Sequence, residues 1–70
     1  MNANPILLQK KYARVIEIFA EKADLSLDDA LKLFYSSSTY RLMHDGVSDM
    51  HCLSDYYLAD ELIMEYRGNI

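Results

Sequence analysis

The stretch Ser26–Tyr40, Ser-Leu-Asp-Asp-Ala-Leu-Lys-Leu-Phe-Tyr-Ser-Ser-Ser-Thr-Tyr, contains a helix start, an apolar stripe and a helix stop. Ser26 is a favoured N-cap, and Asp29 stands three residues later, where the acidic residue of a capping box belongs. Consecutive serines after Tyr35 compete for backbone hydrogen bonds and predict the end of this helix. Its predicted inner face consists of Leu27, Ala30, Leu31 and Phe34.

A longer amphipathic helix is predicted before this stretch. Asn4 is a good N-cap, and Pro5 suits the first helical position because its missing N–H would be unpaired there. The helix is expected to end near Lys22 or Ala23, with Asp24 and Leu25 as a short connection. The apolar stripe predicted to face the core is Leu8, Tyr12, Val15, Ile16, Phe19 and Ala20.

Two further helices are predicted after the serines. Ser37 or Ser38 caps a short helix from Thr39 to about Asp45, and Gly46 suits its C-cap. Ser54 caps the last helix, which Gly68 ends. Between them, residues 47–53 place apolar residues three apart, which favours a helical or 3₁₀ turn and leaves a short extended piece possible. The sequence therefore predicts one all-α domain over residues 1–70, a bundle of three main helices and one short helix.

The size of the chain points to a partner. A chain of 70 residues buries only roughly 60% of the surface that its unfolded form exposes. The single Cys52 excludes an internal disulfide, so a partner, either another protein or a second copy, is the favoured source of extra stability. No apolar run approaches the ~20 residues of a membrane span, and the N-terminus lacks a secretory signal pattern. We expect a cytoplasmic protein that binds no membrane.

Charge argues against nucleic acid. The net charge is −4, and the first 25 residues carry +1 whereas residues 26–70 carry −5. Because nucleic-acid binding depends on Lys and Arg that neutralise phosphates, no nucleic-acid partner is expected. The acidic portion is interpreted as ordinary solvated helix faces, with a face for a basic partner as the alternative.

The densest group of reactive side chains does not match a known site. It contains no CxxC or HExxH spacing, and His44 and Cys52 lack the glycine-rich turn of a thiol active site. The histidines are interpreted as polar loop residues and Cys52 as a small buried filler. We predict no enzyme, no catalytic residue, no metal, no cofactor and no small-molecule substrate. The members of this group are His44, Asp45, Asp49, His51, Cys52 and Asp55.

The tyrosines indicate contact surfaces. Tyr12 and Tyr40 are expected at the edge of the core, and at least one member of each pair Phe34–Tyr35 and Tyr56–Tyr57 must face outward, since neighbours on a helix diverge. The last helix is apolar over more than half its circumference, which favours a homodimer. The predicted partner-binding residues are Tyr35, Tyr56, Asp60, Met64 and Arg67.

The order of these features resembles a family of bacterial proteins of about this length, family 3791 of the domains of unknown function. The resemblance rests on residues 25–43, on His51, and on the last helix from Ser54 to Tyr66. These are structural motifs rather than catalytic ones. The resemblance implies a small helical partner, antitoxin-like or accessory, of an ADP-ribosyltransferase-like protein.

Three hypotheses follow for function. The first is a protein-binding module that self-associates through the last helix and pairs with a neighbouring enzyme. The second is a DNA-binding regulator, because two short helices around a serine turn imitate a helix-turn-helix, although Ser38–Asp45 offers Arg41 as its only Lys or Arg. The third is a metal or thiol enzyme built on His44, His51 and Cys52.

Overall fold

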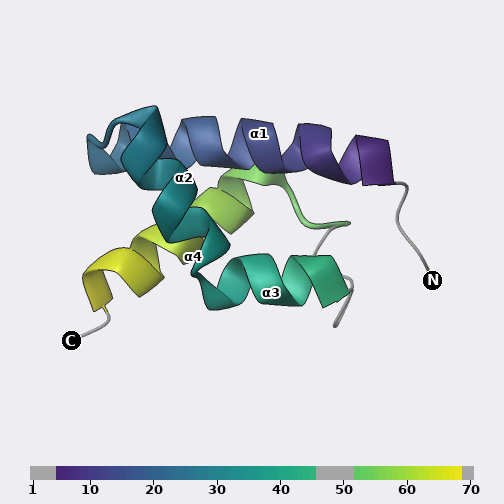
Figure 1. Ribbon diagram of the computed structural model, residues 1–70. Helices are drawn as coiled ribbons and strands as arrows, with labels where there is room; N and C mark the ends of the chain where they lie inside the picture. Colours follow the sequence, from purple (N-terminus) through teal and green to yellow (C-terminus); the bar gives the residue numbers. More distant parts are fainter. Residues whose placement is uncertain (1–4, 46–51, 69–70) are drawn as a thin grey trace.

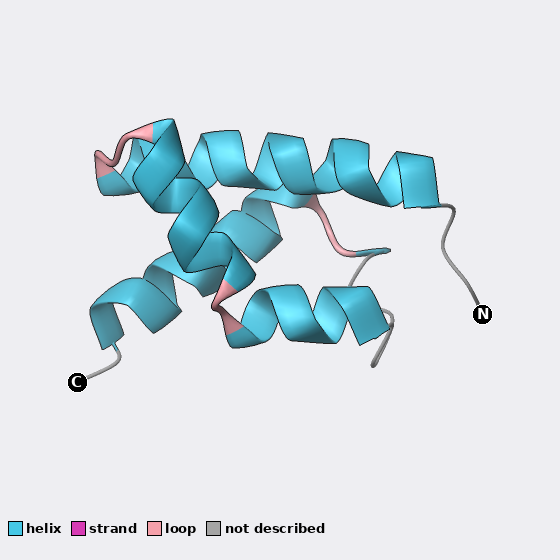
Figure 2. Ribbon diagram, in the orientation of Figure 1, coloured by secondary structure: helices cyan, strands magenta, loops and turns pink. Residues whose placement is uncertain are grey.

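The computed structural model describes residues 5–45 and 52–68, which form four helices and, within these ranges, no strand. The helices are α1 (Pro5–Ala23), α2 (Leu27–Tyr35), α3 (Ser38–Asp45) and α4 (Asp55–Gly68). Two short connections join the first three helices (Figures 1 and 2). The predicted all-α bundle of three main helices and one short helix is confirmed, with each helix within a residue or two of its expected ends.

Helix α1 is the centre of the packing. It lies along the top of the bundle in Figure 1 and contacts both α2 and α4, while α3 joins α2 to α4 below. The predicted stripe of α1 is confirmed, because it is buried from Tyr12 to Ala20 and Leu8 packs against it. The core is completed from the other helices by Ala30, Phe34, Met43, Leu58, Ala59 and Leu62.

The predicted inner face of α2 is only half right. Ala30 and Phe34 are completely buried, but Leu27 and Leu31 are 59% and 42% exposed. Leu27 with Leu31 and Ala30 with Phe34 form two adjacent stripes on α2. The helix is rotated so that only the Ala30–Phe34 stripe faces α1 and α4. The Leu27–Leu31 stripe therefore lies beside the core rather than in it.

The ends of α1 and α2 follow known capping motifs. Asp24 has φ 58°, in the left-handed region, and the N–H groups of Asp24 and Leu25 donate to the carbonyls of Glu21 and Ala20 at 3.3 and 2.9 Å. This is the Schellman arrangement. As predicted, the Ser26 hydroxyl accepts from the Asp29 N–H at 3.1 Å.

Helix α3 receives two caps. Of the two predicted caps, Ser37 and Ser38, it is Ser37 whose hydroxyl accepts from the Tyr40 N–H at 3.0 Å. The second comes from α4: the Glu65 carboxylate accepts from the backbone N–H groups of Ser38 and Thr39, both at 2.9 Å, and from the Thr39 hydroxyl. An anion at a helix N-terminus satisfies unpaired donors and favours the helix dipole. Glu65 thus fixes α3 to α4.

Ion pairs connect α1 to α4. Asp55, in the first turn of α4, accepts from Lys11 at 2.9 Å and from Arg14 at 2.7 Å. Near the other end of α1, Lys22 donates to Asp60 at 3.0 Å. The hydrogen bond from Lys11 is the main cause that lowers the pKa of Asp55 below 3.8, against the opposing effect of desolvation.

The segment before α4 is described only in part. Val47 to His51, and the expected C-cap Gly46, lie outside the described residues. Leu53 is half-buried against the core, as its spacing suggested. Cys52 was predicted to be a buried filler, and that is wrong, because its side chain is exposed. It comes three residues before the start of α4, at the edge of the packed helices, where Leu53 rather than Cys52 turns inward.

Glu65→Ala is expected to lower the free energy of unfolding by roughly 1–2 kcal/mol, because it removes the acceptor for two helix N–H groups and a hydroxyl. Urea denaturation measures the loss, and hydrogen exchange should quicken at Ser38 and Thr39. Glu61→Ala is the matched control, since Glu61 lies one turn earlier on α4 and makes none of these bonds. Equal effects of the two variants would contradict the capping role.

Asp55→Asn is expected to lower the free energy of unfolding by about 1 kcal/mol at neutral pH. It should also make that free energy less dependent on pH in the acid range. The pKa of Asp55 in the folded chain is below its ordinary value of 3.8. The stabilisation that the ionised Asp55 provides is therefore present above pH 3.8 and is lost as the pH falls through the folded pKa. Urea titrations from pH 7 to below pH 3.8 should show that the unfolding free energies of the parent chain and of Asp55→Asn converge in acid. Asp29→Asn is the control for the interaction between a first-turn carboxylate and the helix dipole. Asp29 also lies in the first turn of a helix but forms no ion pair with a described residue.

Candidate functional site

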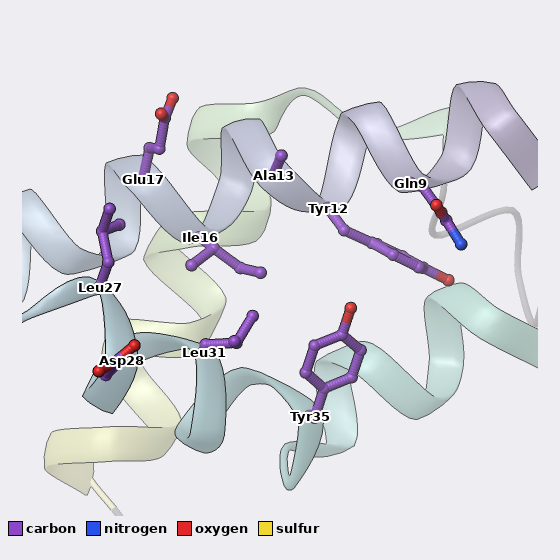
Figure 3. Close-up of a pocket in the computed structure, with 9 residues that line it drawn as sticks. All are labelled: Gln9, Tyr12, Ala13, Ile16, Glu17, Leu27, Asp28, Leu31 and Tyr35. Atoms are coloured by element: carbon purple, nitrogen blue, oxygen red, sulfur yellow. The ribbon is translucent and has the colours of Figure 1, made fainter.

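A groove of about 440 Å³, open to solvent, lies between α1 and α2. Figure 3 shows its walls: one side comes from α1 and the other from successive turns of α2. The chain enters α2 through the tight Asp24–Ser26 connection, so the two helices remain adjacent along this side. The lining residues are Gln9, Tyr12, Ala13, Ile16, Glu17, Leu27, Asp28, Leu31 and Tyr35.

The wall formed by α2 is an exposed apolar stripe. Leu27, Leu31 and Tyr35 follow one another at four-residue spacing, so they lie on one face of the helix. All three are large and more than 40% exposed. Ile16 of α1 points toward this stripe across the groove (Figure 3), and Ala13 also lines the α1 wall. The middle of the groove is therefore apolar surface that the fold leaves in contact with water.

Tyr12 brings a buried hydroxyl to the groove. Its side chain is only 6% exposed, and its hydroxyl has no hydrogen-bond partner among the described residues. The ring packs against Phe34 and Tyr40 with centroids 5.3 and 5.4 Å away. Burial first, and then the neighbouring Tyr40 and Tyr35, raise the pKa of Tyr12 above 10.0. An unpaired buried hydroxyl costs free energy, so the packing of the ring keeps it there.

The two ends of the groove differ chemically. At one end lie the carboxylates of Glu17 and Asp28, which are exposed and make no ion pair with the residues that the structure describes. At the other end lie Gln9 and the hydroxyls of Tyr12 and Tyr35, with the Tyr35 hydroxyl directed toward α1 (Figure 3). The groove is thus acidic at one end, apolar in the middle and hydrogen-bonding at the other.

The predicted partner-binding residues fall into two places. Tyr56, Asp60, Met64 and Arg67 are all exposed and recur at four-, four- and three-residue spacing, which puts them on one face of α4. We call these four residues the α4 stripe. It lies away from Leu58, Ala59 and Leu62, which face the core. Tyr35 is exposed, as predicted, but it lines the α1–α2 groove and does not join this stripe.

The predicted cluster of reactive side chains does not form a site within the described part of the chain. His44 is exposed and its Nδ1 lies 3.3 Å from the Asp45 carboxylate, which is a local contact within α3. Asp55 is held by Lys11 and Arg14. Within residues 5–45 and 52–68 there is no group of three or more His, Cys, Asp or Glu placed to hold a metal ion. Asp49 and His51 lie outside these ranges.

Comparison with known proteins gave no assignment: no protein-family model matches the chain, and no curated protein or solved structure matched it either. The resemblance to family 3791 therefore stays a prediction. As for membranes, none of the described helices combines the length and apolar character that a bilayer span requires.

Sequence reasoning missed the groove for a specific reason. Leu27 and Leu31 have the spacing of core residues, and periodicity alone does not tell which of two adjacent stripes faces inward. Tyr12 and Tyr40 were expected at the edge of the core: Tyr40 is partly buried against the core, whereas Tyr12 is buried within it. Nothing in the sequence indicates that the Tyr12 hydroxyl is unpaired. The available signal was the width of the apolar face of α2, which exceeds what one neighbour covers.

Tyr12→Phe is expected to leave the free energy of unfolding unchanged or to raise it by up to about 1 kcal/mol, because it removes a buried hydroxyl without a partner and keeps the ring. Thermal and urea unfolding measure the change. Tyr57→Phe is the control, as Tyr57 is exposed and its hydroxyl should matter little. A loss of 1 kcal/mol or more in Tyr12→Phe alone would contradict the unpaired hydroxyl.

Proposed function

We propose that this chain acts by binding protein and that the α4 stripe is its self-association surface. The observation that carries the proposal is the exposure of that stripe: Tyr56 and Met64 are 66% and 64% exposed on a helix that buries Leu58, Ala59 and Leu62 on its other side. Tyr, Met and Arg are enriched at protein interfaces, and Tyr and Arg supply many binding hot spots. No chemistry of substrate turnover is needed to account for these residues.

The spacing of the stripe suits an antiparallel pair of α4 helices. Asp60 and Arg67 are seven residues apart, and Met64 lies near the middle of the segment between them. In a two-fold arrangement whose axis passes beside Met64, Asp60 of one copy would face Arg67 of the other twice, and the two Met64 side chains would meet near the axis. Asp60 also accepts from Lys22 of its own chain, which orients the carboxylate without burying it.

A second protein is the other possible occupant of this surface. The resemblance to family 3791 suggests an ADP-ribosyltransferase-like protein encoded nearby, and the acidic, tyrosine-bearing surface is consistent in kind with a neutralising partner. We therefore include the product of the neighbouring gene in the test, although the proposal of protein binding does not depend on its identity.

The α4 stripe is tested by light scattering over a range of concentrations, with the chain alone and co-purified with its genomic neighbour's product. Self-association should appear as a doubled mass that Met64→Glu returns to the monomer, because the charge would be buried without a partner. Leu33→Glu is the control, since Leu33 is also exposed but lies on α2. Both variants should keep the helical circular dichroism of the parent.

The outcomes separate the two occupants. A monomer that forms a complex of defined mass with the neighbour's product, lost in Met64→Glu and kept in Leu33→Glu, supports protein binding and overturns the homodimer. A monomer at all concentrations that forms no such complex would overturn the role proposed for the α4 stripe.

A further inference from the structure

We infer that the groove between α1 and α2 receives a single amphipathic helix of a partner protein. This helix presents apolar side chains to Leu27, Leu31 and Ile16 and a Lys or Arg to Glu17 and Asp28. The inference rests on the proposed protein-binding function but uses a different surface, because none of the four residues of the α4 stripe lines the groove.

A helix is the form of chain that suits these walls. Both walls are helices whose backbone groups are already bonded internally, so they offer no edge to which an extended strand could add. An extended segment would leave its own N–H and C=O groups unpaired in the apolar middle. A helix satisfies its own backbone and offers only side chains. From Gln9 to Glu17 the α1 wall is about 12 Å long at 1.5 Å per residue, enough for two turns of a partner helix.

The acidic end sets the charge of the occupant. Glu17 and Asp28 border the groove without a compensating cation among the described residues. Glu21 lies one turn further along α1, Asp24 lies in the connection to α2, and Asp29 follows Asp28 in the first turn of α2. The same end of the molecule therefore carries five carboxylates, and its Lys22 is paired with Asp60 of α4. A Lys or Arg near this end of the partner helix would meet complementary charge. An acidic helix would be repelled, which provides specificity.

The Tyr12 hydroxyl sets a second requirement at the opposite end. The hydroxyl is buried and unpartnered within the described residues, and Tyr12 as a residue lines the groove. Once the side chains that cover this hydroxyl move aside, a side-chain carbonyl or hydroxyl of the partner placed between Gln9 and Tyr35 would accept its hydrogen bond. The free chain carries the cost of the unpaired group, and the complex removes that cost. This predicts that one substitution, Tyr12→Phe, preserves or improves stability while it weakens binding.

A second copy of this chain is a poor occupant of the groove. The chain carries −4 overall, and its part from Ser26 onward, which supplies α2, α3 and α4, carries the excess of acid. A copy approaching the Glu17–Asp28 end would therefore bring mostly like charge. A one-way contact between the groove of one copy and another surface of the next would also be heterologous, and would build rings or open chains rather than a two-fold dimer.

The probe is a displayed library of helical peptides of about fourteen residues, since shorter helices are marginal in water. Leucines are fixed at i, i+4 and i+7, and all other positions are random. After selection for binding to the intact chain, the selected peptides should contain Lys and Arg more often than Asp and Glu at the positions beyond one end of the leucine stripe. The best peptide is then synthesised, together with a version in which those basic residues are Glu. Its affinity is measured by titration calorimetry.

Matched variants locate the binding site. Leu31→Ser should weaken the selected peptide about tenfold, whereas Leu33→Ser should not, because Leu33 is similarly exposed on the same helix but lies outside the groove. Asp28→Lys should weaken it about tenfold and should favour the Glu version. Asp29→Lys, in the same turn but outside the groove lining, should have a smaller effect. Tyr12→Phe should weaken binding about fivefold.

Three results would overturn the inference. They are a selected pool without basic enrichment, binding that Leu31→Ser and Leu33→Ser reduce equally, and a rise in mass of the chain alone that Leu31→Ser abolishes. None of them bears on the α4 stripe, which is tested by Met64→Glu. Failure of the groove with self-association intact would thus refute this inference alone. Failure of both surfaces would also remove the protein-binding function.

Discussion

Burial of one stripe of α1, from Tyr12 to Ala20, holds the other three helices in place. Helices α2 and α4 each contribute one narrow face to this stripe, and α3 reaches the core mainly through Met43. A 70-residue chain has too few elements to cover every apolar face that this arrangement creates. The groove beside α2 and the stripe on α4 are the faces left over. Both candidate surfaces therefore follow from the same packing constraint.

Local sequence signals predicted the helices well because the physics that ends a helix is local. Ser26 and Ser54 cap α2 and α4 with hydroxyls that accept from N–H groups three residues on, and Gly68 is the last residue of α4. The stripe of α1 was equally clear, since five turns of regular spacing leave one choice of inner face. For α2, nine residues with two adjacent apolar stripes left two choices, and its rotation is decided by α1 and α4.

Contacts between distant residues could not be read from the sequence. Glu65 looked like one of many surface acids, yet it caps α3 across 26 to 27 positions of the chain. Arg14 is similarly one of several basic residues of α1 in the sequence, and its pairing with Asp55 on α4 appears only in the structure. Of the predicted contact residues, four do share one face, because helical spacing alone fixes that, but the separate place of Tyr35 depends on tertiary structure. The groove itself exists only once α1 and α2 are docked.

The two surfaces are separated in a way that matters for binding. The groove is built from α1 and α2, and the stripe belongs to α4, so occupation of one does not consume residues of the other. If two copies pair through α4, the dimer presents two grooves at a fixed separation. A partner that carries two suitable helices would then bind the second groove as an intramolecular step, with an effective concentration that reaches millimolar for a linker of matching length. Weak binding at each small groove would then be sufficient for a stable complex, which is the advantage that dimerisation would give a chain of this size.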